Sequence, residues 1–125
     1  MNPSSAERDQ LFTAFARALF KRDLAALYKA VSPDFVWRYD DGLAITRELV
    51  GPDAIAAHLT ERKDFYATHR FHDVAYHHLP DVSFMTFRVS ETVRATGEVR
   101  EQRGIEYYTF KDGKIALKDV YRKPV

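Results

Sequence analysis

Two β-rich runs that meet at an Asp-Gly dipeptide near the end of the chain constrain the fold most strongly. Residues 104–110 read Gly-Ile-Glu-Tyr-Tyr-Thr-Phe, residues 115–121 read Ile-Ala-Leu-Lys-Asp-Val-Tyr, and Asp112-Gly113 lies between them. An Asp-Gly pair between two such runs is a strong short-range signal for a β-hairpin. Both runs carry apolar residues at odd and even positions, and successive strand residues point to opposite faces. The hairpin therefore predicts a sheet covered on both faces, by the chain's own helices on one and by a second subunit on the other.

The remaining elements predict an α+β fold, because helices come first and strands follow. Ser4 and Glu7 have the spacing of a capping box, Asp23 is suited to cap a second helix, and Pro52 is suited to open a third. A short strand at 35–39, a turn at 40–42 and a short extended segment at 43–50 precede the third helix. Four further strands are expected at about 69–78, 82–95, 98–110 and 114–122. This order predicts a curved antiparallel sheet with the helices on its concave side.

Composition excludes several classes of protein. The 125 residues suit a single domain, expected to span residues 1–125. A net charge of +1 from scattered Lys and Arg gives no electrostatic case for binding nucleic acid. The chain has no cysteine, no apolar leader at its start, and no apolar run near the roughly 20 residues that span a bilayer. We therefore expect a cytoplasmic protein with no membrane association.

No metal or cofactor is expected. The pairs His69/His72 and His77/His78 are the natural metal candidates. No carboxylate stands at an obvious supporting distance in the sequence, and neighbouring residues of a strand point to opposite faces, so His77 and His78 cannot chelate jointly. We predict neither a metal site nor a bound cofactor.

Strand pairing decides which side chains surround Glu106. With Thr96-Gly97 as a two-residue turn, Phe87 faces Glu106 across the two strands. One face then holds this acid within an apolar wall, which consists of Met85, Phe87, Val89, Tyr108 and Phe110.

The register of the last hairpin has two alternatives. A two-residue turn at Asp112-Gly113 puts Asp119 opposite Glu106. A three-residue loop with Gly113 in the left-handed conformation instead brings three other residues onto the face of Glu106, namely Lys118, Val120 and Arg122. Opposite charges favour the second register, and a slip of one residue turns every side chain to the other face.

The order of elements, with Phe-Lys-Asp-Gly-Lys-Ile at 110–115, resembles the SnoaL-like polyketide cyclases. These belong to the nuclear transport factor 2-like superfamily, which also contains ketosteroid isomerases, scyttalone dehydratases and limonene epoxide hydrolases. The resemblance covers essentially the whole chain. It implies a cone-shaped α+β barrel, with a curved sheet wrapped around N-terminal helices, a pocket inside and commonly a dimer across the sheet. Such a scaffold hosts enzymes and binding modules alike, so the fold does not determine the function.

The resemblance also suggests roles for individual residues. Compared with ketosteroid isomerases, Phe15 and Tyr39 replace the oxyanion-hole tyrosine and the general-base aspartate, and only Glu106 keeps the chemistry of its counterpart. Steroid isomerisation is therefore not expected. Compared with scyttalone dehydratases, Tyr39 falls on a substrate-polarising tyrosine and His69 on the catalytic histidine. The aspartate that orients this histidine would fall near Phe20 and is missing.

The candidate catalytic residues are Tyr39, His69 and Glu106. Histidine side chains titrate near neutral pH and suit proton transfer, and a tyrosine hydroxyl can stabilise charge that develops on a carbonyl oxygen. The residues expected to bind the substrate are Phe15, Trp37, Phe87, Tyr108, Lys118 and Arg122. Each catalytic candidate has a structural alternative. The alternative for His69 is a solvent-exposed histidine at the start of a strand. For Tyr39 it is an aromatic residue at the edge of the core, and for Glu106 it is a structural ion pair.

Three functions are compatible with these residues. The first is a cofactor-independent cyclase, dehydratase or isomerase that acts by proton transfer on a small hydrophobic carbonyl compound. The second is a non-catalytic module that binds such a molecule, and the incomplete catalytic sets favour it. The third is a dimeric accessory or interaction domain with a filled core. In each case we expect a homodimer through the sheet, because Phe84, Ile105 and Tyr107 would otherwise be exposed.

Overall fold

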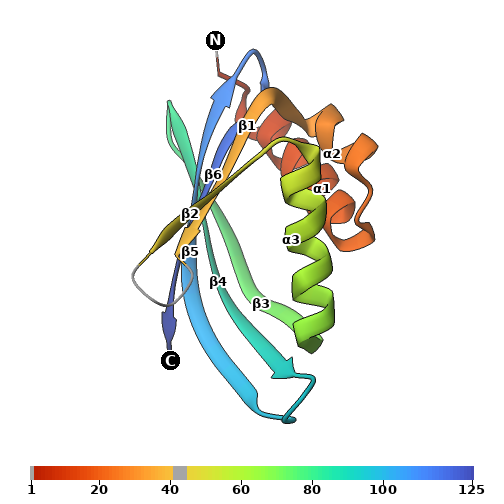
Figure 1. Ribbon diagram of the computed structural model, residues 1–125. Helices are drawn as coiled ribbons and strands as arrows, with labels where there is room; N and C mark the ends of the chain where they lie inside the picture. Colours follow the sequence, from red (N-terminus) through yellow and green to blue (C-terminus); the bar gives the residue numbers. More distant parts are fainter. Residues whose placement is uncertain (1, 41–44) are drawn as a thin grey trace.

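The computed structural model describes residues 2–40 and 45–125, so the turn predicted at 40–42 lies partly outside the described residues. The described residues form three helices and one sheet of six strands that curves around them (Figure 1). The helices are α1 (Ser5–Lys21), α2 (Leu24–Ala30) and α3 (Pro52–Phe65). The strands are β1 (Val31–Asp40), β2 (Thr46–Val50), β3 (Tyr66–His78), β4 (Val82–Val93), β5 (Val99–Lys111) and β6 (Lys114–Pro124). The α+β class and the curved sheet are confirmed.

Local hydrogen bonds begin the first two helices where the sequence predicts. The Ser4 hydroxyl accepts from the backbone N–H of Glu7, and the Glu7 carboxylate accepts from the N–H of Ser4, which completes a capping box at α1. Asp23 caps α2 by accepting from the N–H of Ala26. Pro52 occupies the first turn of α3 after Gly51, whose φ of 88° suits glycine. Within the described chain, no helix is long and apolar enough to cross a membrane.

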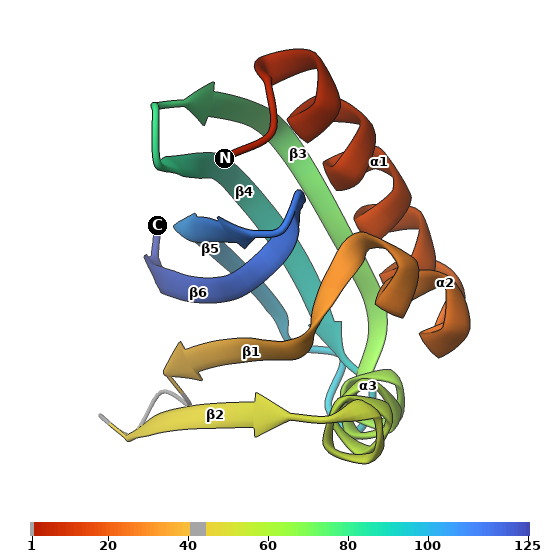
Figure 2. The same ribbon diagram turned by 90° about the horizontal axis from the view of Figure 1, so that it is seen from above.

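The sheet runs in the order β2-β1-β6-β5-β4-β3, and one of its pairings differs from the prediction. Neighbouring strands in the described sheet are antiparallel except β1 and β6, which run parallel. The chain leaves β2 at one edge through α3 and enters β3 at the opposite edge. Viewed from above, α1 and α2 cover one part of the concave face, and α3 lies across another beside β2 (Figure 2).

The β4–β5 pairing is shifted by two residues from the predicted one. The turn spans four residues, 94–97, with Val93 and Glu98 hydrogen-bonded at its base, so Met85 rather than Phe87 faces Glu106. Arg94 explains the longer turn, because its guanidinium donates to backbone carbonyls at the end of α3. The predicted face survives the error, since a shift of two leaves every side chain on its side of the sheet.

The last hairpin combines features of both predicted alternatives. Asp112 and Gly113 form a two-residue turn with φ values of 51° and 77°, and Phe110 pairs with Ile115. The register then shifts by one, so that Glu106 pairs with Val120. A β-bulge, not a three-residue loop, therefore brings Lys118, Val120 and Arg122 onto the inner face.

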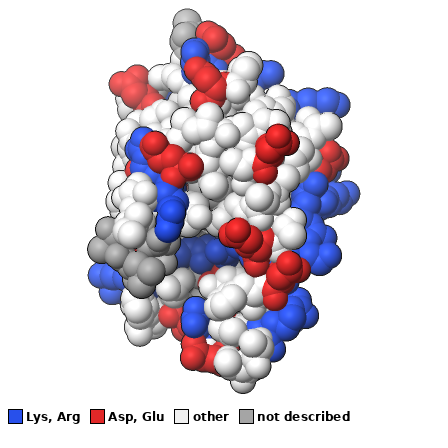
Figure 3. Space-filling model, in the orientation of Figure 1, with Lys and Arg blue, Asp and Glu red and all other residues white. Residues whose placement is uncertain are grey.

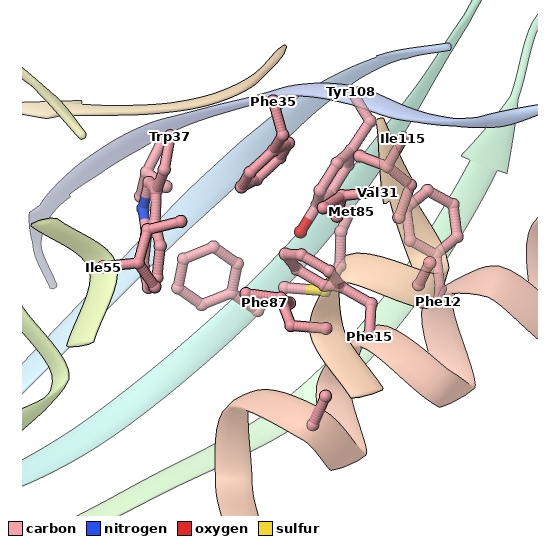
Figure 4. Packing of buried hydrophobic residues seen from close by; sticks show 14 of the residues in the cluster. Phe12, Phe15, Val31, Phe35, Trp37, Ile55, Met85, Phe87, Tyr108 and Ile115 are labelled. Carbon is pink, nitrogen blue, oxygen red and sulfur yellow. The ribbon is translucent and has the colours of Figure 1, made fainter. Parts of the chain in front are cut away.

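The concave face is open in one region and filled in another. Figure 3 shows a hollow between α3 and the sheet, with Lys and Arg atoms at its floor. The region under α1 is packed with buried aromatic and aliphatic side chains (Figure 4). There Phe15 lies 5.9 Å from Phe35 and 6.1 Å from Tyr108 between ring centroids, and Phe12 lies 4.6 Å from Tyr108. Phe15 and Tyr108, predicted to bind substrate, thus belong to the packed core.

Candidate functional site

Glu91 on β4 is the centre of a charged cluster on the concave face. Its side chain is only 1% exposed, and its parity with Phe87 and Val89 turns it inward. Oε2 lies 2.5 Å from Arg62 Nη2 and 2.5 Å from His69 Nδ1, and Oε1 lies 3.3 Å from Arg122 Nη1. These four residues, from α3, β3, β4 and β6, are called the Glu91 cluster below.

The electrostatics of the Glu91 cluster keep its carboxylate ionised. Burial alone would raise the pKa of Glu91, but the hydrogen bond from His69 and the charges of Arg122 and Arg62 outweigh it and lower the pKa to about 2. Glu91 is therefore an anion across the physiological range, and it holds three partners from three other elements.

His69 is oriented by Glu91 across the β3–β4 pair. The two residues are direct strand partners, and the carboxylate lies against Nδ1 of a ring that is 35% exposed. A carboxylate at Nδ1 favours the tautomer that carries its proton there, which leaves Nε2 as the acceptor. The resemblance suggested an orienting acid near Phe20, which the structure places on the surface at 88% exposure. The acid comes instead from the facing strand.

Glu106 lies in a second group, the Glu106 cluster, with Tyr108 and Lys118. Glu106 is buried, accepts a hydrogen bond from the Tyr108 hydroxyl, and has Lys118 Nζ 3.7 Å from its Oε1. Burial and the charge of Glu106 raise the pKa of Tyr108 well above its usual value. These contacts match the structural ion-pair alternative for Glu106.

Lys118 joins the Glu106 cluster to the aromatic side chains of β1 and α1. Its Nζ lies 4.1 Å from the ring centroid of Trp37 and 5.3 Å from that of Phe15, within the range of cation–π attraction. Burial lowers the pKa of Lys118, Glu106 opposes the change, and Arg122 and Arg62 add to it.

The remaining predicted residues lie at the edges of these clusters. Tyr39 is half-buried on β1, and its ring centroid is 4.7 Å from that of His58. Phe87 is buried, 5.1 Å from Phe71 between ring centroids, and Arg122 lies 5.5 Å from its ring. Strand register puts Trp37, Tyr39, His69 and Glu106 on one face of the sheet.

Two shallow depressions lie elsewhere, one between α1 and α2 and the other on the surface of α1. They measure about 290 and 330 Å³, and Gln10 and Ala14 line both. Their lining includes none of the candidate residues.

Comparison with known proteins identifies the family. The profile of the SnoaL-like domain matches residues 12–118 of the chain. The chain belongs to this family. No curated protein sequence matches it. Solved structures similar to this SnoaL-like domain include an NTF2-like protein from Burkholderia xenovorans LB400, at 19% identity and a TM-score of 0.81, covering 96% of this chain and 92% of that one.

Two further structures are similar to this SnoaL-like domain. One is from Xanthomonas campestris pv. campestris and is provisionally named a polyketide cyclase, at 17% identity and a TM-score of 0.76, covering 93% and 90% of the two chains. The other is TerC co-crystallised with polyporic acid, at 14% identity and a TM-score of 0.78, covering 94% and 92%. At these identities the likeness establishes the NTF2-like fold.

Sequence reasoning missed three residues of this SnoaL-like domain: His58, Arg62 and Glu91. Glu91 continues the inward parity of Phe87 and Val89, so an acid at that position could have been noticed. His58 and Arg62 follow the buried Ile55 at helical spacing, so one face of α3 carries all three.

His58 differs from the other charged or titratable groups of the concave face. It is 8% exposed and packs edge-on against Trp37 at 5.0 Å between ring centroids. Burial, followed by the charges of Arg62, Lys118 and Arg122, lowers its pKa to about 4. His58 is therefore a neutral imidazole at neutral pH.

Proposed function

We propose that this SnoaL-like domain is a cofactor-independent enzyme that transfers a proton on a small hydrophobic carbonyl compound, as a cyclase, dehydratase or isomerase. The observation that carries the proposal is the 2.5 Å contact between His69 Nδ1 and Glu91 Oε2. A half-exposed imidazole whose other nitrogen is held by a buried carboxylate has the arrangement of a general base. The names of two similar structures, a polyketide cyclase and TerC with polyporic acid, agree with an organic substrate.

The proposed reaction begins with proton removal by His69. Nε2 takes a proton from a carbon next to the substrate carbonyl, and the electron pair of the C–H bond moves onto the carbonyl oxygen. Glu91 stabilises the imidazolium that forms. Arg62 and Arg122 stabilise the enolate, and Tyr39 donates a hydrogen bond to the substrate oxygen. The proton returns to the same molecule, so the reaction needs no oxidant or reductant.

The alternative is a binding module without catalysis, and one observation favours it. Glu106 and Lys118, both buried, already neutralise each other and the Tyr108 hydroxyl is bonded within the same group. In this alternative the Glu91 cluster, like the Glu106–Lys118 pair, would stabilise the fold, and a bound molecule would dissociate without chemical change.

The test combines a binding screen with an exchange assay. A thermal-shift screen of aromatic and polyketide-like carbonyl compounds identifies ligands, and NMR then follows deuterium exchange at the carbon next to the carbonyl. His69→Asn should slow exchange by about 100-fold, the usual scale of general-base catalysis. His72→Gln is the matched control, because His72 lies on the same strand with an exposed side chain. Ligands that bind without exchange would support the binding module.

The proposal includes a homodimer through the convex face of the sheet. Ile105 and Tyr121 are 44% and 60% exposed there, beside the edge-to-face pair Phe84 and Tyr107 at 5.4 Å between ring centroids. Apolar side chains gathered on one face commonly mark an interface. Sedimentation should give twice the mass of the 14.5 kDa chain, and a monomer at micromolar concentration would contradict the dimer.

A further inference from the structure

The Glu91 cluster and the Glu106 cluster together carry an excess of positive charge. The cations are Arg62, Lys118 and Arg122, and within the described chain the carboxylates that act on Lys118 and Arg122 are Glu91 and Glu106. Three cations against two carboxylates leave one positive charge uncompensated. Arg62 and Arg122 are 28% and 20% exposed and Lys118 is buried, and charges partly removed from water are costly without a partner, so this excess favours a bound anion.

The same cations have hydrogen-bond donors to spare. Arg122 gives Nη1 to Glu91, and its Nε is buried without a hydrogen-bond partner. Lys118 is 3.7 Å from the Glu106 carboxylate, which is an ion pair too long for a good hydrogen bond. A guanidinium carries five N–H donors and an ammonium three, so both groups can bind a further oxygen.

His58 adds a donor without adding charge. Its neutral ring lies beside Trp37 and Tyr39, and the positive charges of Arg62, Lys118 and Arg122 act on it. A neutral imidazole can donate one N–H to an anion, whereas a fourth cation in this group would be repelled by the other three.

Aromatic side chains flank the charged groups. Phe71 on β3 is 41% exposed, lies 5.1 Å from Phe87 between ring centroids, and has the Arg122 guanidinium 5.7 Å from its ring. An exposed aromatic ring beside a guanidinium suits the apolar body of a ligand whose charged group reaches the cations.

From these contacts we infer that the site binds an apolar molecule that carries one ionised oxygen acid, either a carboxylate or an ionised enol. Arg62, Lys118, Arg122 and His58 contact the charged group, and Phe71 and Phe87 contact the body. The inference rests on the site of the proposed function and deepens it by naming the charge of the substrate. It does not require that the molecule be turned over.

The experiment compares an anion with a neutral amide of nearly equal shape, and adds a second anion of a different acid type. The probes are 3-phenylpropanoate, its neutral amide 3-phenylpropanamide, and 5-phenylcyclohexane-1,3-dione, an ionised enol at neutral pH. Trp37 is the one tryptophan of the chain and lies in the site, so its fluorescence reports binding directly. At least one anionic probe should bind about ten- to a hundredfold more tightly than the amide, the scale of charge-assisted hydrogen bonds. Tighter binding by the carboxylate or by the enol identifies which acid the site takes.

Variants locate the effect. Arg122→Gln and Arg62→Gln should each reduce the preference for the anion by about tenfold, as expected when one charge-assisted contact is lost. Arg17→Gln on the exposed surface of α1 is the matched control and should bind like the wild type. If one arginine variant fails to fold, the inference is still tested by the other variant and by the affinities of the wild type for anion and amide.

Equal affinity of the amide and both anions would overturn the inference. So would a preference for the anion that survives both arginine substitutions. This test can be separated from that of the proposed function. If His69→Asn loses proton exchange but the wild type shows no preference for anions, only the inference is refuted. A preference for anions without any proton exchange removes only the proposed reaction.

Discussion

The pH dependence of folding should reveal the buried imidazole of His58. Its pKa lies at about 4 in the folded protein against the ordinary value of 6.5, because burial and three nearby cations disfavour the charged form. As the pH falls below about 6.5, the unfolded chain takes up a proton on His58 and the folded protein does not. Stability therefore decreases as the pH falls from about 6.5 to about 4, and His58 causes no further loss below that.

The magnitude follows from the displacement of the pKa. Each unit is worth about 1.4 kcal/mol, so the shift from 6.5 to about 4 corresponds to about 3 kcal/mol in full. Linkage gives about 2 kcal/mol of this loss between about pH 8 and about pH 5, a range that stays well above the pKa of about 2 of Glu91.

The assay is urea unfolding of the wild type and of His58→Asn, each at about pH 8 and at about pH 5. Asparagine keeps a polar side chain beside Trp37 and Tyr39 but does not titrate. The wild type should lose about 2 kcal/mol more than the variant between about pH 8 and about pH 5, while the other histidines contribute equally to both proteins. His58→Gln should flatten the profile in the same way. Equal losses in wild type and variants would show that His58 is not a buried neutral group.

Three further substitutions test the packing around the site by urea unfolding at neutral pH. Glu91→Gln should cost about 3 kcal/mol, because two arginines lose their buried counter-ion, whereas Glu48→Gln in a surface ion pair should cost less than about 1 kcal/mol. Gly104→Ala should lower stability by about 2 kcal/mol, because the new Cβ would lie 2.5 Å from Phe87 Cζ and 2.5 Å from the backbone oxygen of Tyr121 on β6. Unchanged stability would contradict this geometry. Arg8→Met should cost about 3 kcal/mol, because the buried guanidinium donates to four carbonyls and a hydroxyl, and a loss below about 1 kcal/mol would show that water replaces it.

The sequence predicted those features of the fold that local interactions determine. Ser4, Asp23 and Pro52 mark helix starts because capping involves residues only a few positions apart. Asp112-Gly113 marks the last hairpin for a similar reason. The inner and outer faces of β4 and β5 were also predicted, although their register was wrong, because the error of two residues preserves side-chain parity.

The candidate site could be predicted only in part, because its contacts join distant segments. The contact of Glu91 with His69 depends on the β3–β4 register, and that with Arg62 on the direction of α3. Neither can be obtained from spacing along the chain. The resemblance to scyttalone dehydratases suggested an orienting acid near Phe20, whereas the structure supplies it from β4. The bulge that places Lys118 beside Glu106 likewise has no local signal in the sequence.

Two buried carboxylates of the concave face, Glu91 and Glu106, differ in the exposure of their partners. Glu106 contacts Tyr108 and Lys118, and both of these partners are themselves buried. Glu91 is equally buried, but its partner His69 has a ring that is 35% exposed. Glu91 therefore holds an accessible imidazole, through which it can act on a ligand. In our proposal, proton transfer therefore takes place at His69, where β3 and β4 meet α3.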